Sequence, residues 1–267
     1  MIDPAQTHSH GLRTEPIIEG TDYMLGGYSK LKGTVVRPDG QWLEFIPPAE
    51  KQFSANIETN NCTAFGTTNA IEILMKAKFG KEINLSDRMV GKGSGTSPVL
   101  GNYPKAPADY IRKNWSVFEK EYPFVDDIDE YYKELPRNLV IKATGRGAEY
   151  NFGYEYVRTH DSTSLMQALE YSPVCISVAL MPGVDNEYYK PDGWRDSHWT
   201  TLIGYEYGKY WLVFDSYPSH YPNSTFPPHV KKVRWDTKFE TAMRYSLEHQ
   251  IVNETPWRNF LNWINTL

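Results

Sequence analysis

From Tyr150 onward the chain is dominated by β-branched and aromatic runs separated by turn residues. The runs are YEYVRT, VCISVAL, HWTTLIGYEY, KYWLVFDSY and HVKKVRW. Such runs are typical of strands that pack against a core, so this half predicts an antiparallel sheet. One helix is expected within it, over residues 162–171, with Asp161 or Ser162 as its cap and Pro173 beyond its end.

The first half carries helical signals instead. The segment CTAFGTTNAIEILMKAKF, residues 62–79, has apolar residues at helical spacing and predicts a mostly buried helix. Gly80 suits the position after its last residue, and Asn60 or Asn61 can cap its start. Shorter helices are expected from Ser86 and over residues 108–113, with a loop between them.

The two ends differ from the middle. Residues 1–30 are polar and indicate an extended arm, and the alternating runs around Asp39-Gly40 predict a β-hairpin. Pro256 at a first helical turn, followed by spaced apolar residues, predicts a C-terminal helix. We therefore divide the chain into an arm and hairpin (1–46), a main domain (47–250) and a tail helix (251–267). The main domain has a helical part, about 47–125, and a sheet part, about 126–250.

Composition excludes several classes of function. The net charge of -5 is modest and has no concentrated basic stripe, so nucleic acid is not expected as a partner. No run is long and apolar enough for a membrane span, and the opening residues lack the charged and apolar regions of a signal peptide. With two cysteines, a disulfide framework is excluded and a reducing compartment fits best. We expect a cytoplasmic protein or a component of a virion or similar assembly.

Cys62 is the first candidate for chemistry. At the first turn of a buried helix, free N–H groups and the positive end of the helix dipole favour a thiolate, which is the nucleophilic form. The alternative is that Cys62 is a small buried hydrophobe. Cys175, inside a strand run, is expected to be a core residue of that kind. The histidines show no metal-ligand spacing, so we predict no metal.

The spacing of His198 and Asp215 favours the catalytic interpretation. In papain and cathepsins the histidine and third residue follow the cysteine by roughly 130–150 residues. His198 falls inside that window and Asp215 lies at its end. Both belong to HWTTLIGYEYGKYWLVFDSYP, two strands joined by a turn at Gly208. A hairpin of this kind returns Asp215 to the level of His198.

Several motifs resemble the papain-like cysteine peptidases. CTAFGTTNAIE resembles their C-W-A-F-S helix, and LSDRMV, ADYI and EYPF follow in the family's order. SLMQALEYSPVCISVAL resembles their helix-then-strand segment, HWTTLIGY resembles H-A-V-x-x-V-G-Y, and YWLVFDSYP resembles Y-W-x-x-K-N-S-W-G. The similarity runs from about Pro47 to Val230. It implies an α+β fold of two lobes, with a helical first lobe, a central helix starting at the nucleophile, and an antiparallel second lobe.

The resemblance also implies roles for individual residues. The family's oxyanion-hole glutamine lies six positions before the cysteine, which places Asn56 in that role beside the Cys62 N–H. Asp215 stands where the family has asparagine. We expect it to accept the Nδ1–H of His198 and to favour imidazolium through its charge. Tyr217 replaces the tryptophan that shields this bond from water.

The implied activity is hydrolysis of peptide bonds by a cysteine endopeptidase, through an acyl-enzyme and without a cofactor. Its partners would be peptide or protein substrates. Two alternatives stay open: a cysteine-dependent amidase or transglutaminase, and a scaffold with little activity that serves as a binding component. Departures at Asn56, Asn60, Asn61 and Thr63 keep the last alternative open. We expect no removable propeptide, and contacts within an assembly through the arm and the tail helix.

Overall fold

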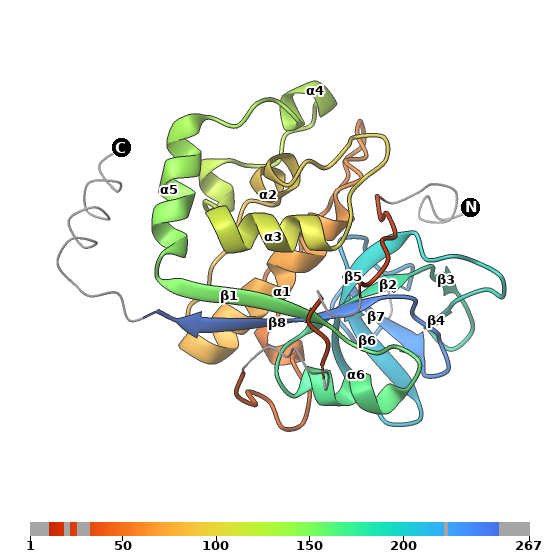
Figure 1. Cartoon of the computed structure of the whole chain (residues 1–267). Helices are drawn as coiled ribbons and strands as arrows, with labels where there is room; N and C mark the ends of the chain where they lie inside the picture. Colours follow the sequence, from red (N-terminus) through yellow and green to blue (C-terminus); the bar gives the residue numbers. More distant parts are fainter. Residues whose placement is uncertain (1–10, 19–21, 26–32, 222–223, 251–267) are drawn as a thin grey trace.

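A computed structural model describes residues 11–18, 22–25, 33–221 and 224–250. The predicted tail helix and most of the predicted arm lie outside these residues. In Figure 1, most helices gather on one side of the molecule and most strands on the other, and helix α1 (Cys62–Phe79) runs between them. One helix, α6 (Ser162–Leu169), lies on the side of the strands. This is the predicted α+β architecture of a helical region followed by an antiparallel sheet.

Six helices form among the described residues. After α1 come α2 (Asp87–Gly93), α3 (Lys105–Asn114), α4 (Ile128–Tyr131), α5 (Arg137–Gly147) and α6 (Ser162–Leu169), and short 3₁₀ turns η2 (Leu43–Phe45) and η3 (Glu119–Glu121) accompany them. The sheet contains β1 (Tyr150–Tyr156), β2 (Val174–Val178), β3 (Met181–Pro182), β4 (Glu187–Tyr189), β5 (His198–Glu206), β6 (Tyr210–Phe214), β7 (Val230–Arg234) and β8 (Ala242–His249).

Helix α1 has the predicted bounds and is buried on every side over its first fourteen residues, Cys62 to Met75. Gly80 ends it in the left-handed conformation, with φ 64°, and its N–H donates to the last carbonyls of the helix. The start differs from the prediction. The Asn61 side chain does not cap the helix but donates to the Asp87 carbonyl and to the Tyr131 hydroxyl. Asn61 therefore ties the start of α1 to the other helices.

The other helical predictions hold in part. Ser86 caps α2 and Asp161 caps α6 through side-chain oxygens, as expected, and α3 covers the predicted 108–113. Helices α4 and α5 were not predicted, and they lie in the stretch assigned to the sheet part. Only two residues of α5 are buried, so its sequence carries little apolar periodicity. The helical region thus extends to Gly147.

The sheet has eight strands in the order β1-β8-β2-β5-β6-β7-β4-β3. All pairs are antiparallel except β4 with β7. The five predicted runs form β1, β2, β5, β6 and β7, whereas β3, β4 and β8 were not predicted. Strands β5 and β6 form the expected hairpin with Gly208 at its turn, where φ is 72°.

The hairpin predicted around Asp39-Gly40 is absent from the described part of that segment. Its turn forms, because the Gly40 N–H donates to the Arg37 carbonyl. The flanking residues bond elsewhere: Val36 donates to the Glu170 carbonyl, and Trp42 donates to that of Ile203. Backbone hydrogen bonds to Glu170 and Ile203 thus take the place of strand pairing within the segment.

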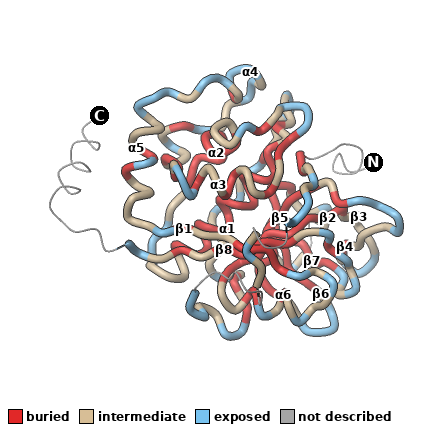
Figure 2. Tube along the Cα trace, in the orientation of Figure 1, coloured by how far each residue is buried: buried red, intermediate tan, exposed pale blue. Residues whose placement is uncertain are grey.

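The core lies between α1 and the sheet, where buried residues gather in Figure 2. Strand β2 is buried at every position, and β5 is buried from His198 to Gly204. Cys175 is fully buried on β2, and its thiol donates to the Gly66 carbonyl of α1, as expected of a core residue. This packing fixes the start of α1 against the start of β5.

Candidate active site

Cys62 is the first residue of α1 and is fully buried. Burial raises the pKa of its thiol, and the negative charges of Glu58 and Asp215 add to this rise. The backbone N–H groups of Trp199 and Thr63 act in the opposite direction. Trp199 follows His198 in the chain, so the thiol faces the start of β5. The start of the helix was expected to favour the thiolate, whereas burial favours the neutral thiol in this state.

His198 and Asp215 meet as the hairpin predicted. His198 begins β5, Asp215 follows the end of β6, and both are buried. The distance from His198 Nε2 to Asp215 Oδ1 is 2.7 Å. The predicted nitrogen was wrong, because the bond to Asp215 uses Nε2 and leaves Nδ1 on the other side of the ring. The Tyr217 N–H donates to the same carboxylate oxygen at 3.1 Å.

Asp215 has a second charged partner that the sequence did not indicate. Lys231 Nζ on β7 lies 2.8 Å from Asp215 Oδ2, and the lysine side chain is only 4% exposed. Burial alone would raise the pKa of Asp215, but Lys231 and then His198 outweigh it and hold that pKa well below its ordinary value. The carboxylate stays ionised although it is buried.

Tyr217 lies where a shield would be needed. Its ring packs edge-on against the His198 imidazole, with 5.2 Å between centroids, and stacks on Phe53 at the same distance. Its hydroxyl donates to Glu58 Oε2 at 2.6 Å. Burial, and after it Glu58, raises the pKa of Tyr217 far above its ordinary value, so the phenol stays neutral.

Asn56, the residue expected to serve as an oxyanion donor beside Cys62, is exposed, and its amide donates to the carboxylate of Asp126. It lies in a tight turn, in which the Ser54 N–H donates to the Ile57 carbonyl and Phe53 bridges Glu58. The turn adds residues between Gln52 and Cys62, so counting six positions back from Cys62 ends inside the turn.

Gln52 precedes this turn, and its side chain contacts Ser216 and Tyr217, which follow Asp215. It is fully buried, and its Oε1 accepts from the Ser216 hydroxyl at 2.7 Å. Its Nε2 donates to Glu58 Oε1 at 2.8 Å and to the Tyr217 hydroxyl at 3.0 Å. A side-chain amide is thus fixed beside the residues that contact His198. The sequence contained this signal, a glutamine before the cysteine, at a longer spacing.

Comparisons with known proteins bear on the family and the fold. No protein-family model matches the chain. Cathepsin L2 of Homo sapiens is 26% identical over 222 residues, 75% of this chain and 62% of the cathepsin. The solved structure of the clostridial cysteine protease Cwp84 superposes with a TM-score of 0.62 at 15% identity, covering 78% of this chain and 57% of Cwp84.

Mexicain of Jacaratia mexicana is 30% identical over 160 residues, which are 57% of this chain and 70% of mexicain. The chain belongs to the papain-like cysteine protease family. This family member spans less than two thirds of the length of cathepsin L2, whereas it spans more than two thirds of mexicain. The fold and the order of Cys62, His198 and Asp215 along the chain agree with the resemblance found in the sequence.

In this papain-like chain an N-terminal segment, Gly11–Glu15, lies across the site. The Leu12 N–H donates to the carbonyl of Ser197, the residue before His198. Asn102 exchanges backbone bonds with both neighbours of Leu12. Gly11 packs so closely on Asn60 that an added Cβ would lie 1.9 Å from the Asn60 carbonyl oxygen. In Figure 1 this red segment lies between α3 and the sheet. The segment thus lies beside Ser197 and Asn60, which neighbour His198 and Cys62 along the chain.

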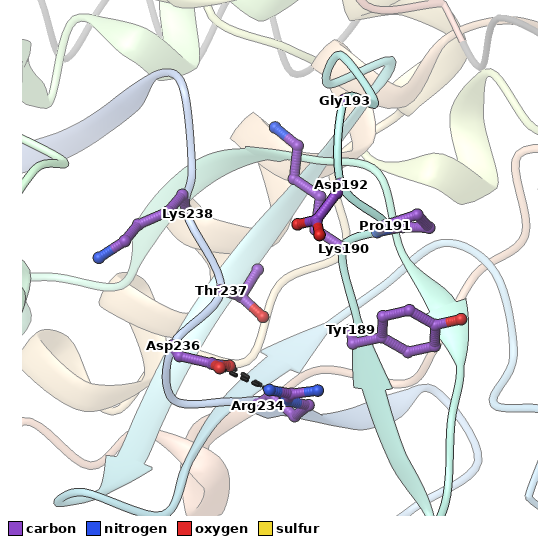
Figure 3. A pocket seen from close by; sticks show the side chains of 9 residues that line it. All are labelled: Tyr189, Lys190, Pro191, Asp192, Gly193, Arg234, Asp236, Thr237 and Lys238. Atoms are coloured by element: carbon purple, nitrogen blue, oxygen red, sulfur yellow. Dashed lines mark hydrogen bonds and ion pairs between the residues drawn. The ribbon is translucent and has the colours of Figure 1, made fainter.

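One described cavity lies apart from these residues. It measures about 450 Å³ and is lined by residues around Lys190 and Arg234 at the far edge of the sheet (Figure 3). Two of its cations are held by carboxylates: Lys190 pairs with Asp196 and Glu240, and Arg234 pairs with Asp236. None of the candidate catalytic residues lines it.

No cluster of histidine, cysteine, aspartate or glutamate side chains among the described residues could hold a metal ion. No helix within the described part of the chain is both long and apolar enough to span a bilayer.

Proposed function

We propose that this papain-like chain is a cysteine endopeptidase in which Cys62 is the nucleophile, His198 the general acid and base, and Asp215 the group that orients the imidazole. The observation that carries the proposal is the buried 2.7 Å bond from His198 Nε2 to Asp215 Oδ1 at the start of β5. That bond sits against the start of α1, where Cys62 lies. It fixes the ring and leaves Nδ1 to exchange a proton with the thiol.

In the proposed reaction, the Cys62 Sγ attacks the carbonyl carbon of a peptide and forms an S–C bond. The imidazolium of His198 gives its proton to the leaving nitrogen as the C–N bond breaks. Water then adds to the thioester, transfers a proton to His198, and releases the acid product with the regenerated thiol.

The negative oxygen formed during attack needs hydrogen-bond donors. The backbone N–H of Cys62 is one, because the first N–H groups of a helix have no partner inside it. We assign the second to the Nε2 of Gln52 in place of Asn56. In the described state Glu58 accepts from this amide, so a substrate would displace Glu58 from it.

An extended peptide is the substrate class that this site suits best. The backbone of the Gly11–Glu15 segment bonds to Ser197 on the sheet side and to Asn102 on the helical side. Those same backbone groups could bond to the main chain of a substrate, independently of its side chains.

The test is covalent labelling with an epoxide inhibitor of thiol proteases, followed by mass spectrometry. We expect one label on Cys62, loss of labelling in Cys62→Ala, and hydrolysis of casein that falls by about 10³-fold or more in the same variant. Cys175→Ala is the matched control, because that thiol is in the core, and it should retain labelling. Labelling that survives Cys62→Ala contradicts the assignment of the nucleophile.

A further inference from the structure

Asp215 is a carboxylate that is buried with almost no exposure to water. A buried carboxylate is costly unless it is paired and hydrogen-bonded. Its two oxygens have separate tasks: Oδ1 receives the His198 Nε2 and the Tyr217 N–H, and Oδ2 lies 2.8 Å from Lys231 Nζ. One oxygen thus faces the imidazole, and the other faces a cation.

The backbone holds this cation in place. Val213 and Phe214 of β6 pair with Lys231 and Val230 of β7. The pairing continues past the end of β6, because the Asp215 N–H donates to the His229 carbonyl at 2.9 Å. The Lys231 ammonium also lies 5.2 Å from the centre of the Tyr188 ring, a distance suited to a cation–π contact. The sheet itself therefore fixes the spacing between ammonium and carboxylate.

We propose that Lys231 is a positioning residue, which cancels the charge of Asp215 so that His198 receives an oriented hydrogen-bond acceptor without a net negative charge behind it. This inference rests on the proposed function of His198. A bare buried carboxylate would stabilise the imidazolium strongly, because an opposite charge within about 4–6 Å favours the charged form. An imidazolium held in this way is a poor acid for the leaving nitrogen. Lys231 removes most of that bias and leaves the geometry intact.

The groups facing His198 and Asp215 come from several elements. Cys62 belongs to α1, and Glu58 to the turn before it. Tyr217 belongs to the segment after β6. Lys231 lies in β7, and His229 directly precedes this strand. Burial lowers the pKa of His229, so this imidazole is neutral near pH 7 and adds no charge. Lys231 is the cation that contacts the carboxylate.

The experiment is an NMR titration of the His198 ring in the Cys62→Ala background, with the resonance assigned by its loss in His198→Gln. Lys231→Met removes the ammonium and keeps most of the side-chain volume. We expect the His198 titration midpoint to rise by about 1 pH unit or more. Asp215→Asn alone should lower it, because the lysine charge is then unopposed.

The double variant Asp215→Asn/Lys231→Met is the decisive control, since it removes both charges together. We expect its His198 midpoint to return close to that of the parent. Lys231→Arg, which keeps the charge, should stay near the parent as well. Circular dichroism and thermal unfolding establish that each variant is folded, and a folded Lys231→Met with an unchanged midpoint overturns the proposal. A double variant shifted as far as Lys231→Met also overturns it.

The same variants in the protein with Cys62 intact give the kinetic readout. The pH profile of kcat/KM for peptide hydrolysis should move with the NMR midpoint, and it should return in the double variant. If the parent hydrolyses no peptide and takes no epoxide label, the proposed function fails. The NMR comparison still decides whether Lys231 offsets the charge of Asp215.

Discussion

The amide of Gln52 is held by three side chains at once. Ser216 donates to its oxygen, while Glu58 and the Tyr217 hydroxyl accept from its nitrogen. An amide fixed in this way is preorganised, so it does not have to reorient when a negative oxygen forms in the reaction. Asn56, four residues along, is exposed and bonded to Asp126.

Gln52→Ala and Asn56→Ala therefore separate the two candidates for the oxyanion donor. We expect Gln52→Ala to lower kcat by about 10²- to 10³-fold, because one donor to the transition state is lost. Asn56→Ala should leave kcat unchanged. Steady-state hydrolysis of a fluorogenic peptide measures both. The opposite ranking would return the role to Asn56.

For single residues, the sequence indicated candidates whose placement depends on the order of motifs along the chain. It gave a different candidate, Asn56, where a position had to be counted back through a turn. Cys62, His198 and Asp215 follow from a helix start and a two-strand hairpin, which are local patterns. Gln52, the donor proposed above, was not predicted because it lies more than six positions before Cys62. Lys231 gave no signal, since a lysine in a strand is normally solvated, and only the pairing of β7 with β6 reveals its partner.

Helix α1 and strand β5 pack closely at Gly66. An added Cβ there would lie 2.8 Å from Cδ1 of Trp199 and 3.6 Å from the Cys175 sulfur. Trp199 also supplies an N–H that lowers the pKa of the Cys62 thiol. The contact between α1 and β5 thus holds Trp199 next to the Cys62 thiol.

Gly66→Ala should be destabilising despite the better helix propensity of alanine. Overpacking costs about 1–3 kcal/mol, against a propensity gain of about 1 kcal/mol. We expect a lower free energy of unfolding in urea and slower peptide hydrolysis, because Trp199 must move. A more stable variant with full activity would show that the contact can relax.

The N-terminal segment offers a second test between elements. Gly11 has φ 93° and no space for a Cβ against Asn60, so Gly11→Ala should release the segment from the site. Each 1.4 kcal/mol of lost docking energy changes such an equilibrium tenfold. We expect alkylation of Cys62 by iodoacetamide to accelerate by about tenfold or more, measured by mass spectrometry on the Cys62 peptide.

The control for that test is Thr14→Ala, in the same segment but exposed. It should alkylate at the parent rate. Equal acceleration in both variants would mean that the effect does not come from the contact of Gly11 with Asn60. Sequence patterns did not predict this contact, because polar arms carry no periodicity that identifies their partner.

The other elements also divide into those with local sequence signals and those fixed by distant partners. Long or capped segments such as α1, α2 and α6 were predicted closely because caps and apolar periodicity are local. Helix α5 buries few residues, and the segment around Gly40 satisfies its backbone with distant partners, so neither could be predicted from local pattern.

Over the whole molecule, buried carboxyl groups in the helical region set the pH dependence of stability. Glu72 and Asp87 are buried, and burial raises their pKa values well above normal. Burial, and after it the charge of Glu50, raises the pKa of Glu119 to about 7. These groups hold protons in the folded state that the unfolded chain releases above about pH 4.5.

Stability should therefore fall as the pH rises from about 5 through 7. In Glu119→Gln the side chain no longer titrates, so it does not have to lose a proton in the folded state as the pH rises. We expect the variant's free energy of unfolding to exceed that of the parent at pH 8, by at most about 3 kcal/mol. The two should converge below about pH 4.5, where the parent carboxyl is protonated in both states. Urea unfolding at pH 4.5, 6 and 8 measures the difference, and an equal gap at every pH would contradict this origin.

The segment over the site is part of the same chain, which changes what dilution can do. A tethered ligand acts at an effective concentration, on the order of millimolar for a short flexible connection, however dilute the protein is. A free peptide must compete at comparable concentrations to enter beside Ser197 and Asn102. The KM of the intact chain would then report this competition more than the intrinsic affinity of the groove, and it would stay the same at every enzyme concentration.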